Sequence, residues 1–344
     1  MLDSGIVVTT VINRSAFAYD GSTGNNKWLV QRKALPNSRA IPLVEAMSVE
    51  TSLADQVITR YEKAAEINRS NPNRSGNLVT LPAGGGAADV MVTADLHGNR
   101  RNFQRILELA ALDVNLDRHL VLQEVCHGGP TYPQGGGCMS HLMLEDVAQL
   151  VCEYPYRVHF MLSNHELAEM VDFPILKGGK MLNLMFRAGL QEMYGNRTAD
   201  VRDAYLHFLR SLPIGVKAGE RLLICHSLPE KCDQRPFNPE VFERPLADED
   251  LACQGDVGRL VWGRDFRQEN ADAFAEQTGA QYFLTGHEPS TDGFQTPNSR
   301  QVILDCCGQN GCYAIVPVDD QISYGKLLAE VQRLHKPAPY PYGM

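Results

Sequence analysis

The chain has 344 residues, of which 44% are hydrophobic and 21% are charged, so it can bury one large core plus a smaller appendage. It has no run of the roughly 20 apolar residues that span a membrane, and no basic and apolar leader at its N-terminus. We therefore expect a cytoplasmic protein without membrane association. The formal net charge of -9 disfavours nucleic acid as a partner, and nine cysteines without a CxxC pair favour reduced thiols.

The first part of the chain predicts an N-terminal extension. Residues 48–68 place apolar side chains at helical spacing, and residues 71–86 have the Pro, Asn and Gly content of a linker. We therefore divide the chain into an extension over 1–85, a main domain over 86–320, and a C-terminal helix and tail over 321–344.

Strands and helices alternate in the main domain. Helical patterns cover residues 102–112 and 140–151, and Ser140 is a candidate N-cap for the second of them. Short apolar runs before, between and after these helices predict five buried strands: Asp89–Ala94, His119–Leu122, Arg157–Leu162, Arg221–Cys225 and Gln281–Leu284. Such alternation is typical of a layered α/β architecture.

A short polar motif directly follows each of the five strands. The motifs are DLHGN, QEVCHGG, SNHE, CHS and TGHEP, and the chemistry in them comes from Asp95, His97, Glu124, Asn164, His165, His226 and His287. Ligands of open α/β sheets bind beyond the carboxyl ends of the strands, so we expect these side chains to converge. Imidazole, carboxylate and amide groups suit divalent cations such as Mn, Fe or Zn. Any one of these residues alone would more often be structural; their joint order favours a metal site.

The order of these motifs resembles that of the calcineurin-like metallophosphoesterases, and is nearest to their phosphoprotein phosphatase branch, which includes the Ser/Thr phosphatases. The resemblance covers roughly residues 87–319, with a degenerate second motif, and makes 86–320 a catalytic domain. It implies a four-layer α/β/β/α sandwich with mixed sheets. Residues 302–319 resemble the hairpin that closes the fold in this branch.

The resemblance also implies a ligand set for two divalent metal ions. One ion would be held by Asp95, His97 and His287, and the other by Asn164 and His226. Glu124 stands at the position of the bridging aspartate of the family, and is one methylene longer.

The catalytic residues that the resemblance implies depart from the family pattern in one motif. His165 aligns with the proton donor to the leaving group, whereas His127 and Gly128 replace an Asp-Arg pair whose arginine clamps phosphate. We favour a structural role for His127 over an orienting one. Arg264 resembles the second arginine of the family, and Arg101 or its neighbour Arg100 is a candidate substitute for the first.

Two long loops follow the second and fourth motifs. Residues 128–137 are rich in glycine but lack the Lys-Ser/Thr ending of a P-loop, so we favour a flexible connection over a phosphate cradle. Residues 229–254 form either a lid or specificity insert beside the site, or a solvated surface loop.

Taken together, the motifs predict a hydrolase of phosphoesters. A hydroxide shared by two metals would attack phosphorus, and a histidine would protonate the leaving group of a phosphorylated protein, nucleotide or small molecule. One alternative is a non-catalytic scaffold that binds a phosphorylated partner, which the missing Asp-Arg pair favours. A further alternative is a nucleotide phosphodiesterase or a diadenosine tetraphosphatase-like hydrolase.

Overall fold

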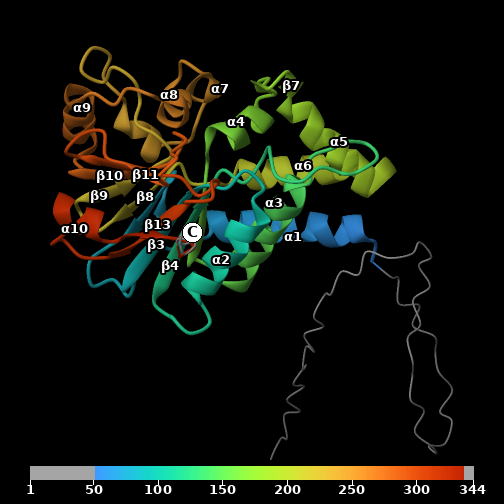
Figure 1. The fold of residues 1–344 in the computed structure, drawn as a ribbon, viewed down its shortest axis with the longest axis horizontal. Coiled ribbons are helices and arrows are strands. Elements are labelled where there is room, and N and C mark those ends of the chain that lie inside the picture. The colour runs from blue at the N-terminus through green and yellow to red at the C-terminus, as the bar shows by residue number, and fades with distance from the viewer. Residues whose placement is uncertain (1–50, 337–344) are drawn as a thin grey trace, which may run out of the picture. The chain divides into compact units, whose positions relative to one another are not determined.

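The computed structural model describes residues 51–336, so residues 1–50 of the expected extension and 337–344 of the expected tail lie outside the described residues. Two mixed β-sheets stand between helices in the described part of the chain (Figure 1). This is the four-layer α/β/β/α arrangement that the motif order predicts, and the prediction is confirmed.

The smaller sheet has five strands in the order β14-β13-β3-β4-β5. Its strands β3, β4 and β5 run parallel to one another, so their carboxyl ends lie at one edge. The bounds in this sheet are β3 Asp89–Asp95, β4 Arg118–Gln123, β5 Val158–Met161, β13 Cys312–Pro317 and β14 Val331–Arg333. The helices nearest to this sheet in Figure 1 are α1 Leu53–Arg69, α2 Arg100–Ala110, α3 Ser140–Glu153 and α6 Thr198–Leu209.

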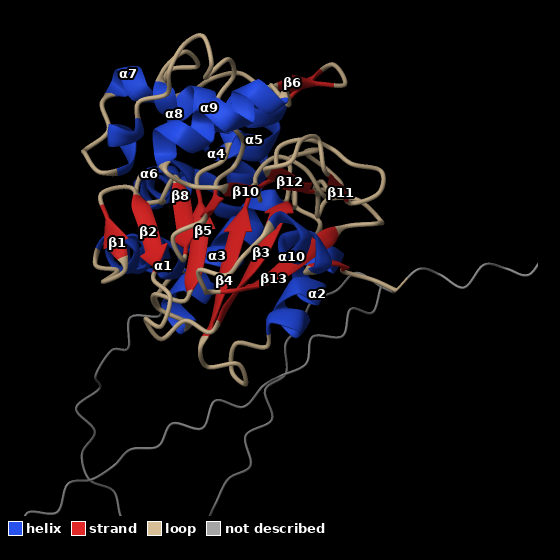
Figure 2. Ribbon diagram, turned by 90° about the vertical axis from the view of Figure 1, so that its left-hand side faces the viewer, coloured by secondary structure: helices blue, strands red, loops and turns tan. Residues whose placement is uncertain are grey.

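The larger sheet has seven strands in the order β1-β2-β8-β9-β10-β12-β11, and β10 is parallel to both β9 and β12 (Figure 2). Its bounds are β1 Arg74–Ser75, β2 Leu78–Leu81, β8 Gly215–Ala218, β9 Leu222–Ile224, β10 Tyr282–Thr285, β11 Phe294–Gln295 and β12 Gln301–Leu304. The remaining helices are α4 Asn164–Met170, α5 Leu182–Tyr194, α7 Asp248–Leu251, α8 Asp256–Trp262, α9 Gln268–Thr278 and α10 Tyr324–Ala329, with 3-10 turns at Gly195–Arg197 and Pro239–Phe242. A separate hairpin consists of β6 Leu176–Lys177 and β7 Lys180–Met181.

All five strands predicted from the apolar runs form, as β3, β4, β5, β9 and β10. Their apolar side chains are buried on both faces because each strand lies between another sheet and a helical layer. The expected helices over 48–68, 102–112 and 140–151 form as α1, α2 and α3, and α10 lies in the expected C-terminal segment. None of the helices within residues 51–336 is long and apolar enough to cross a bilayer.

The prediction of a linker over residues 71–86 is wrong. This range contains β1 and β2, and β2 pairs with β8 in the larger sheet, where Val79 and Leu81 are buried. The Asn77 side chain also donates to the carbonyl oxygens of Val241 and Arg244, each at 2.8 Å. A strand of only four residues between proline and glycine clusters gives a weak local signal, and its pairing with a distant strand stabilises it.

The prediction of a closing hairpin over residues 302–319 is also wrong. β12 pairs with β10 and β11, whereas β13 pairs with β3 and β14 in the other sheet. The connection crosses between the two sheets at buried Cys306, whose Sγ accepts a hydrogen bond from the backbone nitrogen of Ala94 at 3.2 Å. The chain therefore links the two sheets at the strand end that carries Asp95.

Candidate metal centre

The ends of the strands bring the predicted residues together. Asp95 ends β3, Glu124 follows β4, Asn164 begins α4 after β5, and His226 and His287 follow β9 and β10. All five are almost fully buried. Two groups of possible ligand atoms, each within 4.8 Å, share Glu124: one is His97, Glu124 and His165, and the other is Glu124, His226 and His287.

Glu124 lies at the centre of these contacts. Its Oε1 is 3.0 Å from His97 Nε2 and 3.4 Å from His165 Nε2, and its Oε2 is 2.8 Å from His226 Nε2. The Oε2 contact is close, yet its geometry is not that of a hydrogen bond, so this buried oxygen has no donor within the described residues. A carboxylate with one oxygen toward each group of imidazoles is placed to bridge two cations.

The hydrogen bonds of His226 show which of its ring nitrogens carries the proton. Gln123 donates its amide hydrogen to Thr93 O at 2.8 Å, so its Oε1, 2.8 Å from His226 Nδ1, accepts from that nitrogen. Burial lowers the pKa of His226 and favours the neutral ring. Nε2 then has a lone pair, yet it lies 2.8 Å from both Glu124 Oε2 and Asn164 Oδ1, which are acceptors too. The lone pairs of His226 Nε2, Glu124 Oε2 and Asn164 Oδ1 thus face one another without a proton between them, and a bound cation would fit among them.

The buried carboxylates also fit a cation. Burial raises the pKa of Asp95 to about 8, with the charge of Glu124 as a second cause, and burial raises the pKa of Glu124 to about 7. Within the described chain, neither carboxylate forms an ion pair with a lysine or arginine. A divalent cation would favour both ionised carboxylates and so remove this cost of burial.

The ring of His287 lies beside Asn164 and His226. Its ring Nδ1 is 3.2 Å from Asn164 Oδ1, and its Nε2 is buried without a hydrogen-bond partner in residues 51–336. Burial lowers the pKa of this ring to about 2. Only the backbone of His287 reaches Asp95, through an N–H bond of 2.9 Å to Oδ1. The ring groups with Glu124 and His226, whereas the sequence predicted that it shares one metal with Asp95 and His97.

The backbone around the centre has an unusual conformation that brings the motifs into contact. His97, Glu124, His127 and His287 all have positive φ angles, between 44° and 71°. Such angles are uncommon in residues with a β-carbon and cluster at functional sites. Gly286 is needed for a different reason, because a β-carbon there would lie 2.5 Å from Asp95 Oδ1.

Comparison with known proteins agrees with this geometry. The sequence pattern of the calcineurin-like phosphoesterases matches residues 88–291. The chain belongs to this family. It is therefore a metallophosphoesterase, which hydrolyses phosphoric esters with the help of metal ions. None of the curated protein sequences compared with the chain matches it.

Solved structures with a similar fold include phosphatases. A protein serine/threonine phosphatase from Saccharomyces cerevisiae, described as similar to human phosphatase PP5, has a TM-score of 0.54 and 16% identity, over 76% of this chain and 82% of that chain. A cold-active protein-tyrosine phosphatase of a psychrophilic Shewanella species has a TM-score of 0.50 and 13% identity, over 73% of this chain and 78% of that chain. At these identities the likeness shows a shared fold.

In this metallophosphoesterase, His165 is oriented by two residues behind it. Its Nδ1 is 3.0 Å from His127 Nδ1, and His127 Nε2 is 2.9 Å from Glu169 Oε1. Glu169 also accepts from Asn183 and Tyr205. Its pKa is lowered despite burial by the contact with His127, the charge of Arg187 and the hydrogen bond from Tyr205. His127 thus lies where it can orient His165, whereas the sequence favoured a structural role for it.

Sequence reasoning missed Glu169, and it assigned Ser140 to a helix cap and not to its contact with His127. Glu169 lies four residues after His165 on α4, a spacing that places both on one face of the helix and could have suggested the pair. Ser140 does not cap α3, whose N-cap is Met139; its hydroxyl accepts the backbone N–H of His127 at 3.0 Å. It therefore fixes the loop that carries the orienting histidine.

The two predicted arginines have different locations. Arg264 lies beside the centre, where its Nη2 donates to His287 O at 3.3 Å and its Nε forms an ion pair with Glu288 at 2.9 Å. Arg101 instead lines a separate cavity between α2 and Leu334–Lys336. Its neighbour Arg100 lines the cavity that contains His97, but it is paired with Asp146.

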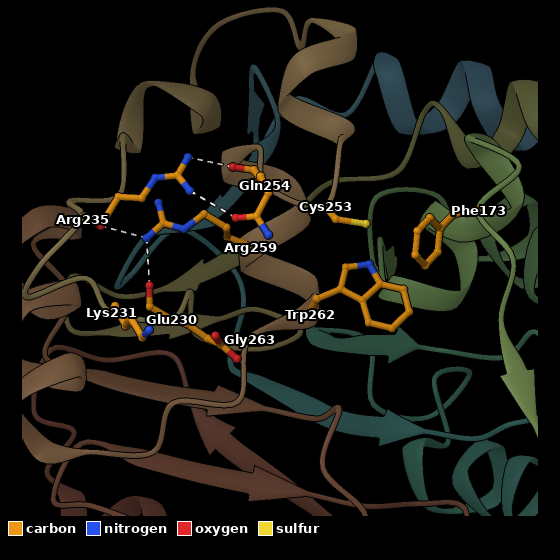
Figure 3. Close-up of a pocket in the computed structure, with 9 residues that line it drawn as sticks. All are labelled: Phe173, Glu230, Lys231, Arg235, Cys253, Gln254, Arg259, Trp262 and Gly263. Atoms are coloured by element: carbon orange, nitrogen blue, oxygen red, sulfur yellow. Dashed lines mark hydrogen bonds between the residues drawn. The ribbon is translucent and has the colours of Figure 1, made fainter.

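A cavity of about 570 Å³ is lined by Phe173 and Trp262, among other residues (Figure 3). The Trp262 ring is 6.0 Å from the His287 ring and 5.8 Å from the Phe173 ring. Much of the lining comes from the loop after the fourth motif: Glu230, Lys231, Arg235, Cys253 and Gln254. Since Phe237 and Val241 of this loop are buried in the core, the structure favours the specificity insert over the solvated loop.

Proposed function

We propose that the protein is a dinuclear metallophosphoesterase whose ions, Mn, Fe or Zn, share Glu124. His97 would lie on one side of this carboxylate, and Asn164, His226 and His287 on the other. The observation that carries the proposal is the unprotonated His226 Nε2, which faces two acceptor oxygens at 2.8 Å. Asp95 would complete the centre, since within residues 51–336 its buried carboxylate has only the backbone of His287 as a hydrogen-bond partner.

Two divalent cations at such a centre would activate water as a nucleophile and neutralise the phosphoryl oxygens. The chain itself would then have to orient the ester and protonate its leaving oxygen. We assign the proton to His165 Nε2, on the edge of the ring that faces Glu124. Burial and the neighbouring imidazoles lower the pKa of His165, and the other ring nitrogen, Nδ1, lies 3.0 Å from His127 Nδ1. Glu169 would hold His127 in that orientation.

The substrate is a phosphorylated molecule, and we propose a phosphomonoester of phosphatase type. The cavity lined by Trp262 would take the group that the phosphate is attached to. The cytoplasmic location expected from the sequence stays a prediction.

Metal analysis and an assay on p-nitrophenyl phosphate test this proposal together. We expect about two divalent ions per chain and hydrolysis that depends on added Mn, Fe or Zn. Asn164→Ala and His226→Ala should each lose one ion and most activity, whereas Glu145→Gln, a buried substitution outside the centre, should lose neither. Bound metal without hydrolysis of any phosphoester would favour the non-catalytic scaffold, and no bound metal would refute the proposal.

A further inference from the structure

The β6–β7 hairpin brings a lysine to the metal centre. Figure 1 shows β7 beside α4 and α5. Lys177 and Lys180 are cross-strand partners in the hairpin, and the turn between them is formed by Gly178 and Gly179. Both glycines have positive φ, 57° and 74°, as a tight two-residue hairpin turn requires.

Lys177 lines the same cavity as His97, one member of the first group of possible ligands. This cavity has a volume of about 550 Å³, and its lining includes His97, His127, Gly128, Lys177 and Cys307. Lys180, across the turn, does not line it. Both lysines are exposed and belong to one hairpin, but only Lys177 lines the cavity that contains His97.

The hairpin is held in this place from its base. Leu182 N donates to Ile175 O, and Ile175 N donates to Asn183 Oδ1, each at 2.8 Å. Asn183 in turn donates to Glu169 at 3.0 Å, the carboxylate that contacts His127. The position of Lys177 is thus tied to the hydrogen bonds that orient the proton donor.

The Lys177 ammonium is available for an anion. Within residues 51–336, no hydrogen bond or ion pair engages it, whereas Arg100 and Arg264 are each paired with a carboxylate.

Gly128 of the second motif lines this cavity and cannot carry a side chain with the present backbone. A β-carbon at Gly128 would lie 2.4 Å from the backbone oxygen of His97, so this position excludes an arginine with the present backbone. A cation for the phosphate must therefore come from another element.

We propose that Lys177 binds the phosphate group of the substrate, and that the β6–β7 hairpin is a phosphate-binding element of this chain. The inference rests on the proposed phosphoester hydrolysis and assigns a residue to its substrate. Lys177 would approach the phosphate from the side of His97, and Arg264 from the side of His287.

Binding of inorganic phosphate to the Mn-loaded full-length protein tests this inference apart from turnover. By isothermal titration calorimetry, Lys177→Ala should weaken phosphate binding about 10-fold or more, since a charged hydrogen bond is lost. Lys177→Arg should retain most of the affinity, and Lys180→Ala is the matched control that should leave it unchanged. Metal content and thermal stability should be the same in all variants because both lysines are exposed.

Kinetics with p-nitrophenyl phosphate give a second readout. Lys177→Ala should raise KM more than it lowers kcat, because the ammonium would contact the phosphate in the ground state as well as the transition state. Equal phosphate affinity in Lys177→Ala and Lys180→Ala would overturn the inference, even in an active enzyme. Weaker binding only in Lys177→Ala, in a protein without hydrolase activity, would support the inference and refute the proposed function.

Discussion

Replacing Glu124 with glutamine should separate two effects of this buried carboxylate: the stability that its ionisation removes from the metal-free protein, and the stability that it adds by binding metal. Burial raises the pKa of Glu124 from its ordinary 4.5 to about 7. Because the pKa is higher in the folded state than in the unfolded state, the folded metal-free protein holds a proton on Glu124 that the unfolded chain has released. The stability from this proton is complete below about pH 4 and is lost as the pH rises through 7. At pH 8 the ionised side chain costs about 3 kcal/mol, from about 1.4 kcal/mol for each unit between the two pKa values.

Urea unfolding at pH 5 and pH 8, with EDTA or with Mn, would measure this effect. With EDTA at pH 8, Glu124→Gln should be more stable than the wild type by up to about 3 kcal/mol, and at pH 5 the difference should be much smaller. With Mn the order should reverse, because the wild type gains the free energy of metal binding and the variant loses its bridging ligand.

Glu145→Gln is the matched control for this experiment. Glu145 is buried too, but it accepts hydrogen bonds from His141 at 2.9 Å and Tyr194 at 2.6 Å, away from the centre. Its substitution should have the same effect on stability with EDTA and with Mn. If Glu124→Gln destabilises the metal-free protein at pH 8, or gains as much from Mn as the wild type, the reasoning about this carboxylate is wrong.

Three further substitutions test the neighbours of Glu124. Gln123→Leu removes the acceptor that fixes the tautomer of His226, and titration with Zn should show affinity reduced about 10- to 100-fold. Gly286→Ala places a β-carbon 2.5 Å from Asp95 Oδ1, so metal analysis should show reduced occupancy in a protein that still folds; full occupancy would show that the strand end can shift. His165→Asn should keep its metals and slow hydrolysis of alkyl phosphates by about 100- to 10,000-fold, with p-nitrophenyl phosphate partly spared because its leaving group needs no proton. Equal loss on both substrates would assign His165 to phosphate positioning instead.

Local sequence was enough to predict most of the fold. Asp89–Ala94 and the four other apolar runs are strands because β-branched and apolar residues fit a sheet that is buried on both faces. The elements that were missed depend on distant partners. β2 forms against β8, and β12 and β13 belong to different sheets, although only seven residues, 305 to 311, separate them. Pairing of this kind is decided by tertiary packing, which no local pattern contains.

The candidate site divides in the same way. The motifs alone indicated Asp95, His97, Glu124, Asn164 and His226, because polar residues directly after buried strands of an α/β sheet meet at one edge. The structure brings these five together, while their role as ligands remains our proposal.

Only the tertiary structure showed what surrounds them. Gln123 and Glu169 look like ordinary polar residues in sequence, and their roles depend on which ring nitrogen of His226 or His127 each one contacts. The sequence did not show that the ring of His287 contacts Asn164, on which we base its place in the proposed centre. Lys177 reaches the centre only because a hairpin 50 residues after His127 folds back onto it. Residue type and spacing along the chain determine which groups are available, whereas distance and direction between them arise from packing of elements that are far apart in sequence.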